Sequence, residues 1–211
     1  MAGILDLLNG PMGKILISGA SKQFGLGEDS TQKAMSAAMP LILGAMKNNA
    51  STPEGASGLL GALMGDKHDG GILDKLGSVL GGSSVDDDVM QDGAGILGHV
   101  FGGKEEHVAQ AVSKSSGIDL GAAMNILKVA GPFLMGAIGK QARTQNISDQ
   151  NGIGDLLGGL LGSGQKEQQS LINRLLDADG DGSIIDDVAG MLMSGGKKGG
   201  IGSLLGGLFG K

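Results

Sequence analysis

The sequence has no cysteine, tryptophan or tyrosine, and only four phenylalanines among its 211 residues. Without cysteine there can be no disulfide, no thiolate zinc site and no cysteine nucleophile. The near absence of aromatic rings means that any core must be built from leucine, isoleucine, valine, methionine and alanine. These absences remove several classes of enzyme and metalloprotein before any motif is considered.

Basic residues are also scarce, because 16 lysines and arginines stand against 22 acidic residues, for a net charge of −6. Proteins that bind nucleic acid cluster lysine and arginine, so nucleic acid is not an expected partner. The N-terminus has no basic region, and Asp6, Asn9 and Pro11 interrupt its apolar residues, so no Sec signal is predicted. No uninterrupted apolar run reaches about 18 residues, so no spanning helix is predicted either. We therefore expect a cytoplasmic protein, while secretion by a non-Sec route stays open.

Glycine, in contrast, is abundant at 43 residues. Each ordered glycine in a helix costs roughly 0.5 to 1 kcal/mol relative to alanine, so a monomer of this composition should be marginally stable. Small residues let helix backbones approach closely. We expect tight helix packing, metal binding or self-association to compensate, and a homo-oligomer is the expected state.

Residues 21–46 repeat without a gap at an offset of 92 residues, as residues 113–138. Both copies carry apolar residues at helical spacing, so both are predicted amphipathic helices. Each contains a proline, Pro40 or Pro132, which lacks the backbone donor that a helix interior needs. A kink and a break between two short helices are both consistent with this pattern.

Short segments in which glycine flanks leucine or isoleucine form a second repeat, here called the glycine–leucine segments. Their apolar residues recur at spacings of three and four, which predicts short helices that end at glycine. The polar stretches 48–54, 141–151 and 163–169 are predicted loops. The glycine–leucine segments are 58–65, 71–82, 95–103, 152–162 and 200–210, with a weaker copy at the N-terminus.

The expected fold class is therefore all-α, an internally duplicated glycine-rich protein of short amphipathic helices with a C-terminal EF-hand-like calcium loop. Its expected parts are a first helical half at 1–82, a duplicate half at 83–164, a helix-loop-helix at 165–193 and a glycine-rich tail at 194–211.

The calcium loop is predicted from the sequence DADGDGS, which begins at Asp177. Carboxylates at loop positions 1, 3 and 5 converge on one hard cation, glycine at position 6 makes the turn, and position 7 offers its carbonyl. Position 12 is Val188 where an EF-hand has glutamate, so the loop would close one residue early on Asp187, with Asp186 as the alternative. The competing interpretation is an acidic turn that caps a helix without metal. The predicted calcium ligands are Asp177, Asp179, Asp181, Ser183, Asp187 and Asp186.

Several other motifs are incomplete, and no enzyme is predicted. Residues 98–104 have a P-loop outline, but Glu105 follows where serine or threonine must hold magnesium. Residues 30–33 read S-x-x-K without companion motifs, so Asp29 or Ser30 is interpreted as a helix cap. The glycines at 102 and 103 separate His99 from His107, so we expect a packed His99 rather than a zinc ligand. The acidic run 86–88 is interpreted as a helix start rather than a metal site.

Two stretches, GAGILGHVFGGKEEHVAQAVSKSSGIDL and LLDADGDGSIIDDVAGML, resemble the YidB-like bacterial family, a domain of unknown function (DUF937). The resemblance covers most of residues 1–192. It implies an α-helical bacterial protein with no assigned reaction, and it supplies no mechanism.

The leading functional hypothesis is a non-catalytic calcium-binding protein that associates with itself or a partner through its glycine–leucine faces. The alternative is a membrane-active protein whose glycine–leucine segments partition into a bilayer, weakly for segments this short.

Overall fold

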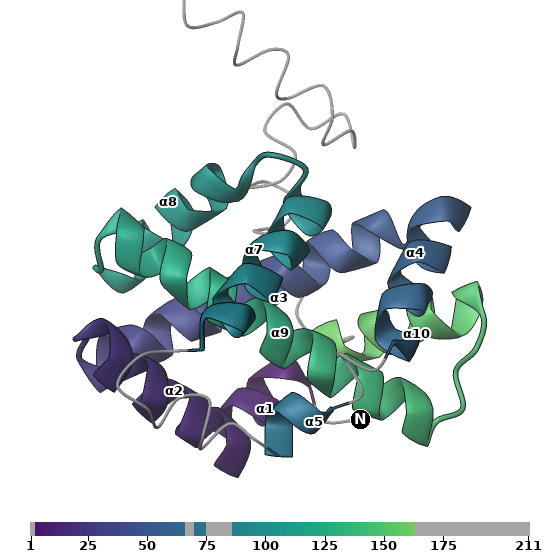
Figure 1. The fold of residues 1–211 in the computed structure, drawn as a ribbon, viewed down its shortest axis with the longest axis horizontal. Coiled ribbons are helices and arrows are strands. Elements are labelled where there is room, and N and C mark those ends of the chain that lie inside the picture. Colours follow the sequence, from purple (N-terminus) through teal and green to yellow (C-terminus); the bar gives the residue numbers. More distant parts are fainter. Residues whose placement is uncertain (1–2, 66–69, 75–85, 163–211) are drawn as a thin grey trace, which may run out of the picture. The chain divides into compact units, whose positions relative to one another are not determined.

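The computed structural model describes residues 3–65, 70–74 and 86–162, which belong to the first of two compact units, Met1–Ile172. The second unit, Asn173–Lys211, lies outside the described residues. The described residues form helices and contain no strand, which confirms the all-α class. Their helices, labelled as in Figure 1, are α1 (Ile4–Asn9), α2 (Pro11–Phe24), α3 (Glu28–Asn49), α4 (Pro53–Met64), α5 (Gly71–Asp74), α7 (Asp87–Phe101), α8 (Glu105–Ser116), α9 (Leu120–Thr144) and α10 (Gln150–Leu161).

The two long helices, α3 and α9, pack against each other at the centre of this unit (Figure 1). Helix α7 lies along α9, α8 packs on both α3 and α9, and α10 packs on α3 and α4. The core is aliphatic, as the composition predicts, and among the described residues it includes two phenylalanine rings, those of Phe133 on α9 and Phe101 on α7. Methionine fills much of the remaining space, with Met35, Met39 and Met46 of α3 all at most 1% exposed.

Both prolines lie inside continuous helices, Pro40 within α3 and Pro132 within α9. The interpretation of a break between two short helices is therefore wrong for both positions. Each proline still removes one backbone donor, so the carbonyl four residues earlier, that of Lys128 in α9, loses its usual partner. Both proline rings are buried, and the packing of the long helices around them offsets the lost hydrogen bond.

Several helix ends stand at positions 92 residues apart in the chain. Helices α2 and α8 end at Gly25 and Gly117, both left-handed with φ of 64° and 75°. The hydroxyl of Ser21 donates to the carbonyl of Leu26 at 2.6 Å, and Ser113 donates to Ile118 at the same distance. The N-caps of α3 and α9, Gly27 and Asp119, also stand at corresponding positions.

The fourth helices of the two halves are capped in the same way. The Thr52 side chain accepts a hydrogen bond from Gly55 N at 3.1 Å at the start of α4. The Asp149 side chain accepts from Gly152 N at 2.9 Å at the start of α10. The order of helices and caps is thus the same from α2 to α4 as from α8 to α10.

The glycine–leucine segments that the structure describes are helical and end at glycine where their C-caps are seen, at Gly65, Gly102 and Gly162. Of the segment 71–82, Gly71–Asp74 is helical and the rest lies outside the described residues, as does 200–210. The predicted loop at 141–151 is wrong in its first part, because α9 continues to Thr144. Ala142 is fully buried there, and its packing in the core stabilises the helix through this polar stretch.

Two side chains cap helices that are distant in sequence. Arg143 Nη2 lies 3.4 Å from Leu63 O and 3.2 Å from both Met64 O and Gly65 O, at the C-terminus of α4. The amide of Asn49 donates to His99 O and Val100 O, both at 3.1 Å, in the last turn of α7. Each cap satisfies carbonyls that have no partner within their own helix, and the arginine adds a favourable charge at the negative end of α4.

Arg143→Met is expected to lower the free energy of unfolding by about 1 to 2 kcal/mol, because α4 loses its charged cap while the aliphatic stem is retained. Urea denaturation followed by circular dichroism measures the change. Lys114→Met, which removes an exposed charge from the last turn of α8, is the control and should change stability by less than about 0.5 kcal/mol. Equal effects of the two substitutions would contradict the capping role.

Helix α9 is long and apolar enough to cross a membrane, although no uninterrupted apolar run predicts this. Within the structure, 72% of its most apolar 18-residue window is buried inside the protein. That burial is what the central helix of a globular core shows, and α9 occupies this central place.

Candidate functional site

The predicted calcium loop lies outside the described residues, so the structure does not place its ligands. These are Asp177, Asp179, Asp181, Ser183, Asp186 and Asp187. Within residues 3–65, 70–74 and 86–162, no three or more histidine, aspartate or glutamate side chains gather as metal ligands would.

His99 and His107 lie on separate helices, in the last turn of α7 and near the start of α8. Gly102 and Gly103, with φ of 59° and 92°, end the first helix between them, as the sequence predicts. The expectation of a packed His99 is wrong, because its side chain is exposed. Ile96, Leu97 and Phe101 take the inner face of α7 and leave His99 on the solvent side.

The acidic run at Asp86 to Asp88 starts a helix, as predicted. Asp86 is the N-cap of α7, and its carboxylate accepts from Asp88 N at 3.1 Å. Asp87 and Asp88 occupy the first turn, where negative charge is favourable beside the free N–H groups. All three side chains are exposed, which fits a solvated cap.

The P-loop outline at 98–104 does not form a phosphate cradle. Gly98 is inside α7, and the Gly103 N–H donates to the Glu105 carboxylate at 3.3 Å. The Gly103 N–H, which would have to bind a phosphate, is thus already bound to a carboxylate.

The S-x-x-K pattern is the start of α3, but the predicted cap at Asp29 or Ser30 is wrong by two or three residues. The N-cap is Gly27 in an extended conformation, and Thr31 Oγ1 donates to its carbonyl at 3.0 Å. Glycine offers no side chain to accept a hydrogen bond, so capping preferences pointed to the neighbouring polar residues.

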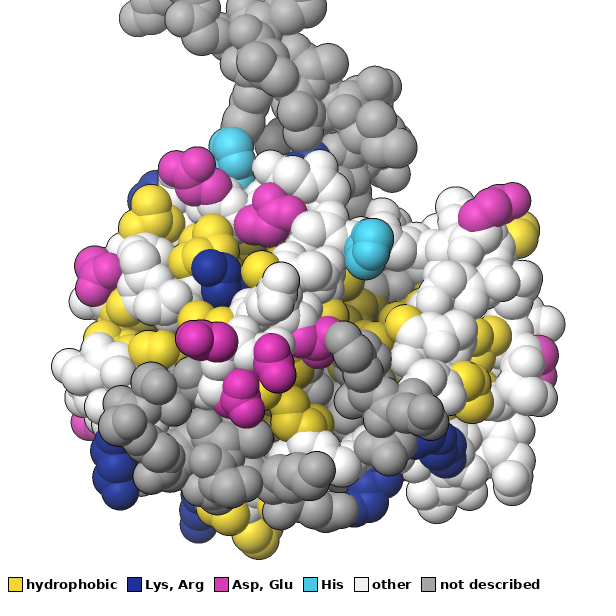
Figure 2. Space-filling model, in the orientation of Figure 1, with side chains coloured by type: hydrophobic (Ala, Val, Ile, Leu, Met, Phe, Trp, Pro, Cys, Tyr) yellow, Lys and Arg dark blue, Asp and Glu magenta, His cyan; other side chains and the backbone are white. Residues whose placement is uncertain are grey.

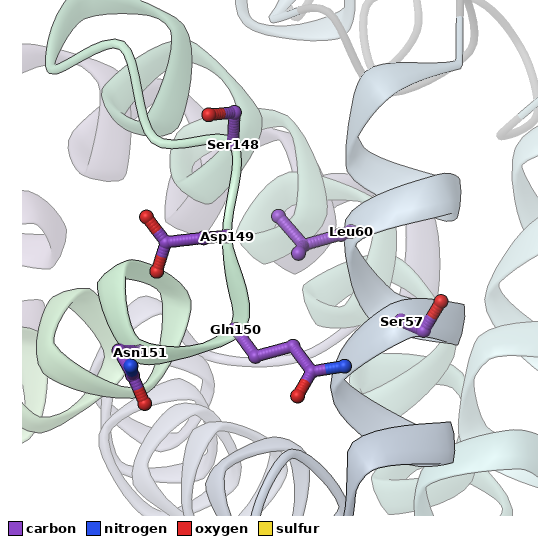
Figure 3. Close-up of a pocket in the computed structure, with 6 residues that line it drawn as sticks. All are labelled: Ser57, Leu60, Ser148, Asp149, Gln150 and Asn151. Atoms are coloured by element: carbon purple, nitrogen blue, oxygen red, sulfur yellow. The ribbon is translucent and has the colours of Figure 1, made fainter.

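An open depression lies between α4 and the start of α10 (Figure 3). Two of its polar side chains already serve the fold, since Asp149 caps α10 and the Gln150 amide donates to Pro53 O at 3.1 Å. No side chains among its lining residues form a nucleophile with a neighbouring base. The lining residues are Ser57, Leu60, Ser148, Asp149, Gln150 and Asn151.

The glycine–leucine helices differ in how much of their apolar face remains free. In α10, Ile153, Leu156, Leu157 and Leu160 are at most 2% exposed. In α4, Leu63 is fully buried, but Met64 is 42% exposed, and Leu59 and Leu60 are half-buried. Intramolecular packing therefore uses the face of α10, while part of α4 stays open to solvent.

Comparison with known proteins gives one result that bears on identity. No curated protein and no solved structure matches the chain. A family model described as a bacterial protein of unknown function (DUF937) matches residues 6–141, which begin within α1 and end in the last turn of α9. The match covers more than half of the chain, and this chain therefore belongs to the DUF937 family.

Proposed function

We propose that this protein is a non-catalytic, calcium-binding helical protein that associates with itself through its glycine–leucine helices. The observation that carries the proposal is the packing of α4 on α10, which buries one glycine–leucine helix against another. This pairing occurs within one chain, and the exposed part of α4 offers a similar surface to a further helix. Two polar side chains of the depression beside α4, those of Asp149 and Gln150, already make hydrogen bonds to the backbone of α10 and α4, which supports a role without catalysis.

The two halves of the unit are proposed to be copies of one four-helix arrangement. The matching left-handed caps at Gly25 and Gly117 and the matching serine hydrogen bonds support this proposal. So does the cross-wise packing, in which α10 lies on α3 and α4 lies on α9. Such an exchange of helices between two like halves resembles domain swapping between the subunits of a dimer.

Calcium binding is proposed from the alternation of carboxylates at Asp177, Asp179 and Asp181 and from the glycine that follows them. With a single loop, a structural or buffering role fits better than a calmodulin-like switch. A cytoplasmic location is part of the proposal.

Self-association is expected at micromolar concentration, because α4 keeps Met64 and two leucines partly in water. Sedimentation velocity should show species heavier than the 21.0 kDa chain, with a sedimentation coefficient that rises with concentration. A single monomeric species over the whole range, with a high melting temperature, would contradict the proposal.

The membrane alternative is separated from self-association by adding vesicles. Neutral and anionic liposomes should leave the protein in the supernatant if its glycine–leucine faces pack on protein. Depletion of the protein by both kinds of liposome would instead favour the membrane-active function.

A further inference from the structure

Helix α4 presents an outward face that no residue within 3–65, 70–74 or 86–162 covers closely. Met64 is 42% exposed on this face. A Cβ added at Gly58 or Gly61 would find no heavy atom within 4 Å. Figure 2 shows few charged side chains over α4, and the helix itself carries one, Glu54. The face is thus open and nearly uncharged, and its glycines would let the backbone of another helix approach closely.

Helix α10 shows how deeply the apolar face of a glycine–leucine helix is buried when other helices pack on it. Leu156 and Leu157, which correspond to Leu59 and Leu60 of α4, are 1% and 0% exposed. Leu161, which corresponds to Met64, is 9% exposed. The same positions are therefore covered in α10 and partly uncovered in α4.

The segment 200–210, outside the described residues, repeats the α10 segment 152–162 almost without change. It differs in having Ser203 for Asp155, which is exposed in α10, and Phe209 for Leu161, at the edge of the buried face. All the other residues of the buried face are identical. As a helix, this segment would carry an apolar face that requires the same kind of cover as α10.

We propose that the outward face of α4 is the docking surface for the 200–210 segment of a second copy of the chain. This proposal rests on the proposed self-association and identifies the two surfaces that would meet, the α4 face of one copy and the 200–210 segment of the other. Glycines on both sides allow close backbone approach, at Gly58 and Gly61 on α4 and at Gly206 and Gly207 on the segment.

Charge complementarity favours the same pairing. Lys197, Lys198 and Lys211 flank the uncharged segment, whereas α4 carries Glu54 and the whole chain has a net charge of −6. Because lysines stand at both ends of the segment, one end can lie beside Glu54 in either orientation of the two helices.

Two substitutions in the full-length chain test the pairing by sedimentation. Gly61→Glu places a charge on the docking face, and Leu205→Asp does so on the segment. Each should raise the dissociation constant for self-association by at least about tenfold. An equimolar mixture should recover complexes, because one intact face and one intact segment remain. Gly95→Glu, at an exposed and open position of α7, is the matched control and should associate like the wild type.

Glutamate is a better helix former than glycine, so loss of association in Gly61→Glu would not reflect a weakened α4. If the wild type and both variants associate equally, the docking surface is wrong while self-association stands. If the wild type is monomeric, the proposed self-association is wrong and this pairing fails with it. Binding of a labelled 199–211 peptide to the monomeric Leu205→Asp chain but not to vesicles supports the surface. Binding to vesicles alone overturns it.

Discussion

Replacing Gly93 by alanine is expected to lower the free energy of unfolding by about 3 kcal/mol or more. Gly93 lies on α7 against the backbone of α9, and an added Cβ would overlap the carbonyl of Lys128. This carbonyl stands four residues before Pro132, so it has lost its usual intrahelical donor. The methyl group would push apart α7 and α9, which share the most extensive contact among the described helices. Urea denaturation of the variant measures the loss.

Gly95→Ala on the same helix is the matched control. A Cβ at Gly95 meets nothing within 4 Å, so alanine should raise stability by up to about 1 kcal/mol through helix propensity. Opposite signs for two substitutions two residues apart would show that the effect at Gly93 is steric. If Gly93→Ala is as stable as Gly95→Ala, α7 and α9 do not approach as closely as described.

The helices and many of their ends could be predicted from sequence because local chemistry determines them. Apolar residues at helical spacing indicated both long helices, and Gly102 and Gly103 were correctly assigned as a helix end. The cap at Asp86 was likewise predicted, since an acidic side chain before a helix satisfies its first N–H groups. These features depend on neighbours within a few residues.

Other features depend on residues far away in the chain, and the sequence pattern could not show them. A break at Pro132 was one of two expectations, but packing on α3 and α7 keeps α9 continuous. Arg143 was placed in a predicted loop, yet it caps α4 from about eighty residues away. The sequence alone marks Gly93 only as one of many glycines that make a helix less stable. Glycine is required at this position because the backbone of another helix lies against it.

The candidate metal site has a different limit, because two interpretations fit the same local sequence. Its prediction rests on the spacing of residues within one short loop, which is local information that a sequence carries well. The same aspartates could also cap a helix without any metal, as Asp86 caps α7. Only a measurement of metal binding separates the two interpretations.

Calcium is expected to bind with measurable heat and to stabilise the protein. The carboxylates of Asp177, Asp179, Asp181, Asp186 and Asp187 stand within eleven residues and repel one another without metal. A divalent cation converts this repulsion into attraction, with the Ser183 carbonyl completing the shell. Linkage gives about 2.7 kcal/mol of stabilisation when calcium is a hundredfold above its dissociation constant. Magnesium should substitute poorly, because it demands a tighter octahedral shell.

Asp181→Ala should abolish both the calcium heat in titration calorimetry and the calcium-dependent rise in melting temperature, because it removes the central ligand. Asp88→Ala is the control, since this carboxylate lies in the first turn of α7 and its backbone N–H is bound by Asp86. It should leave the calcium heat unchanged. If the wild type gives no heat with calcium, or Asp181→Ala gives the same heat, the aspartates cap a helix as Asp86 does. The carboxylates would then serve the fold alone, and calcium would have no part in the function of this protein.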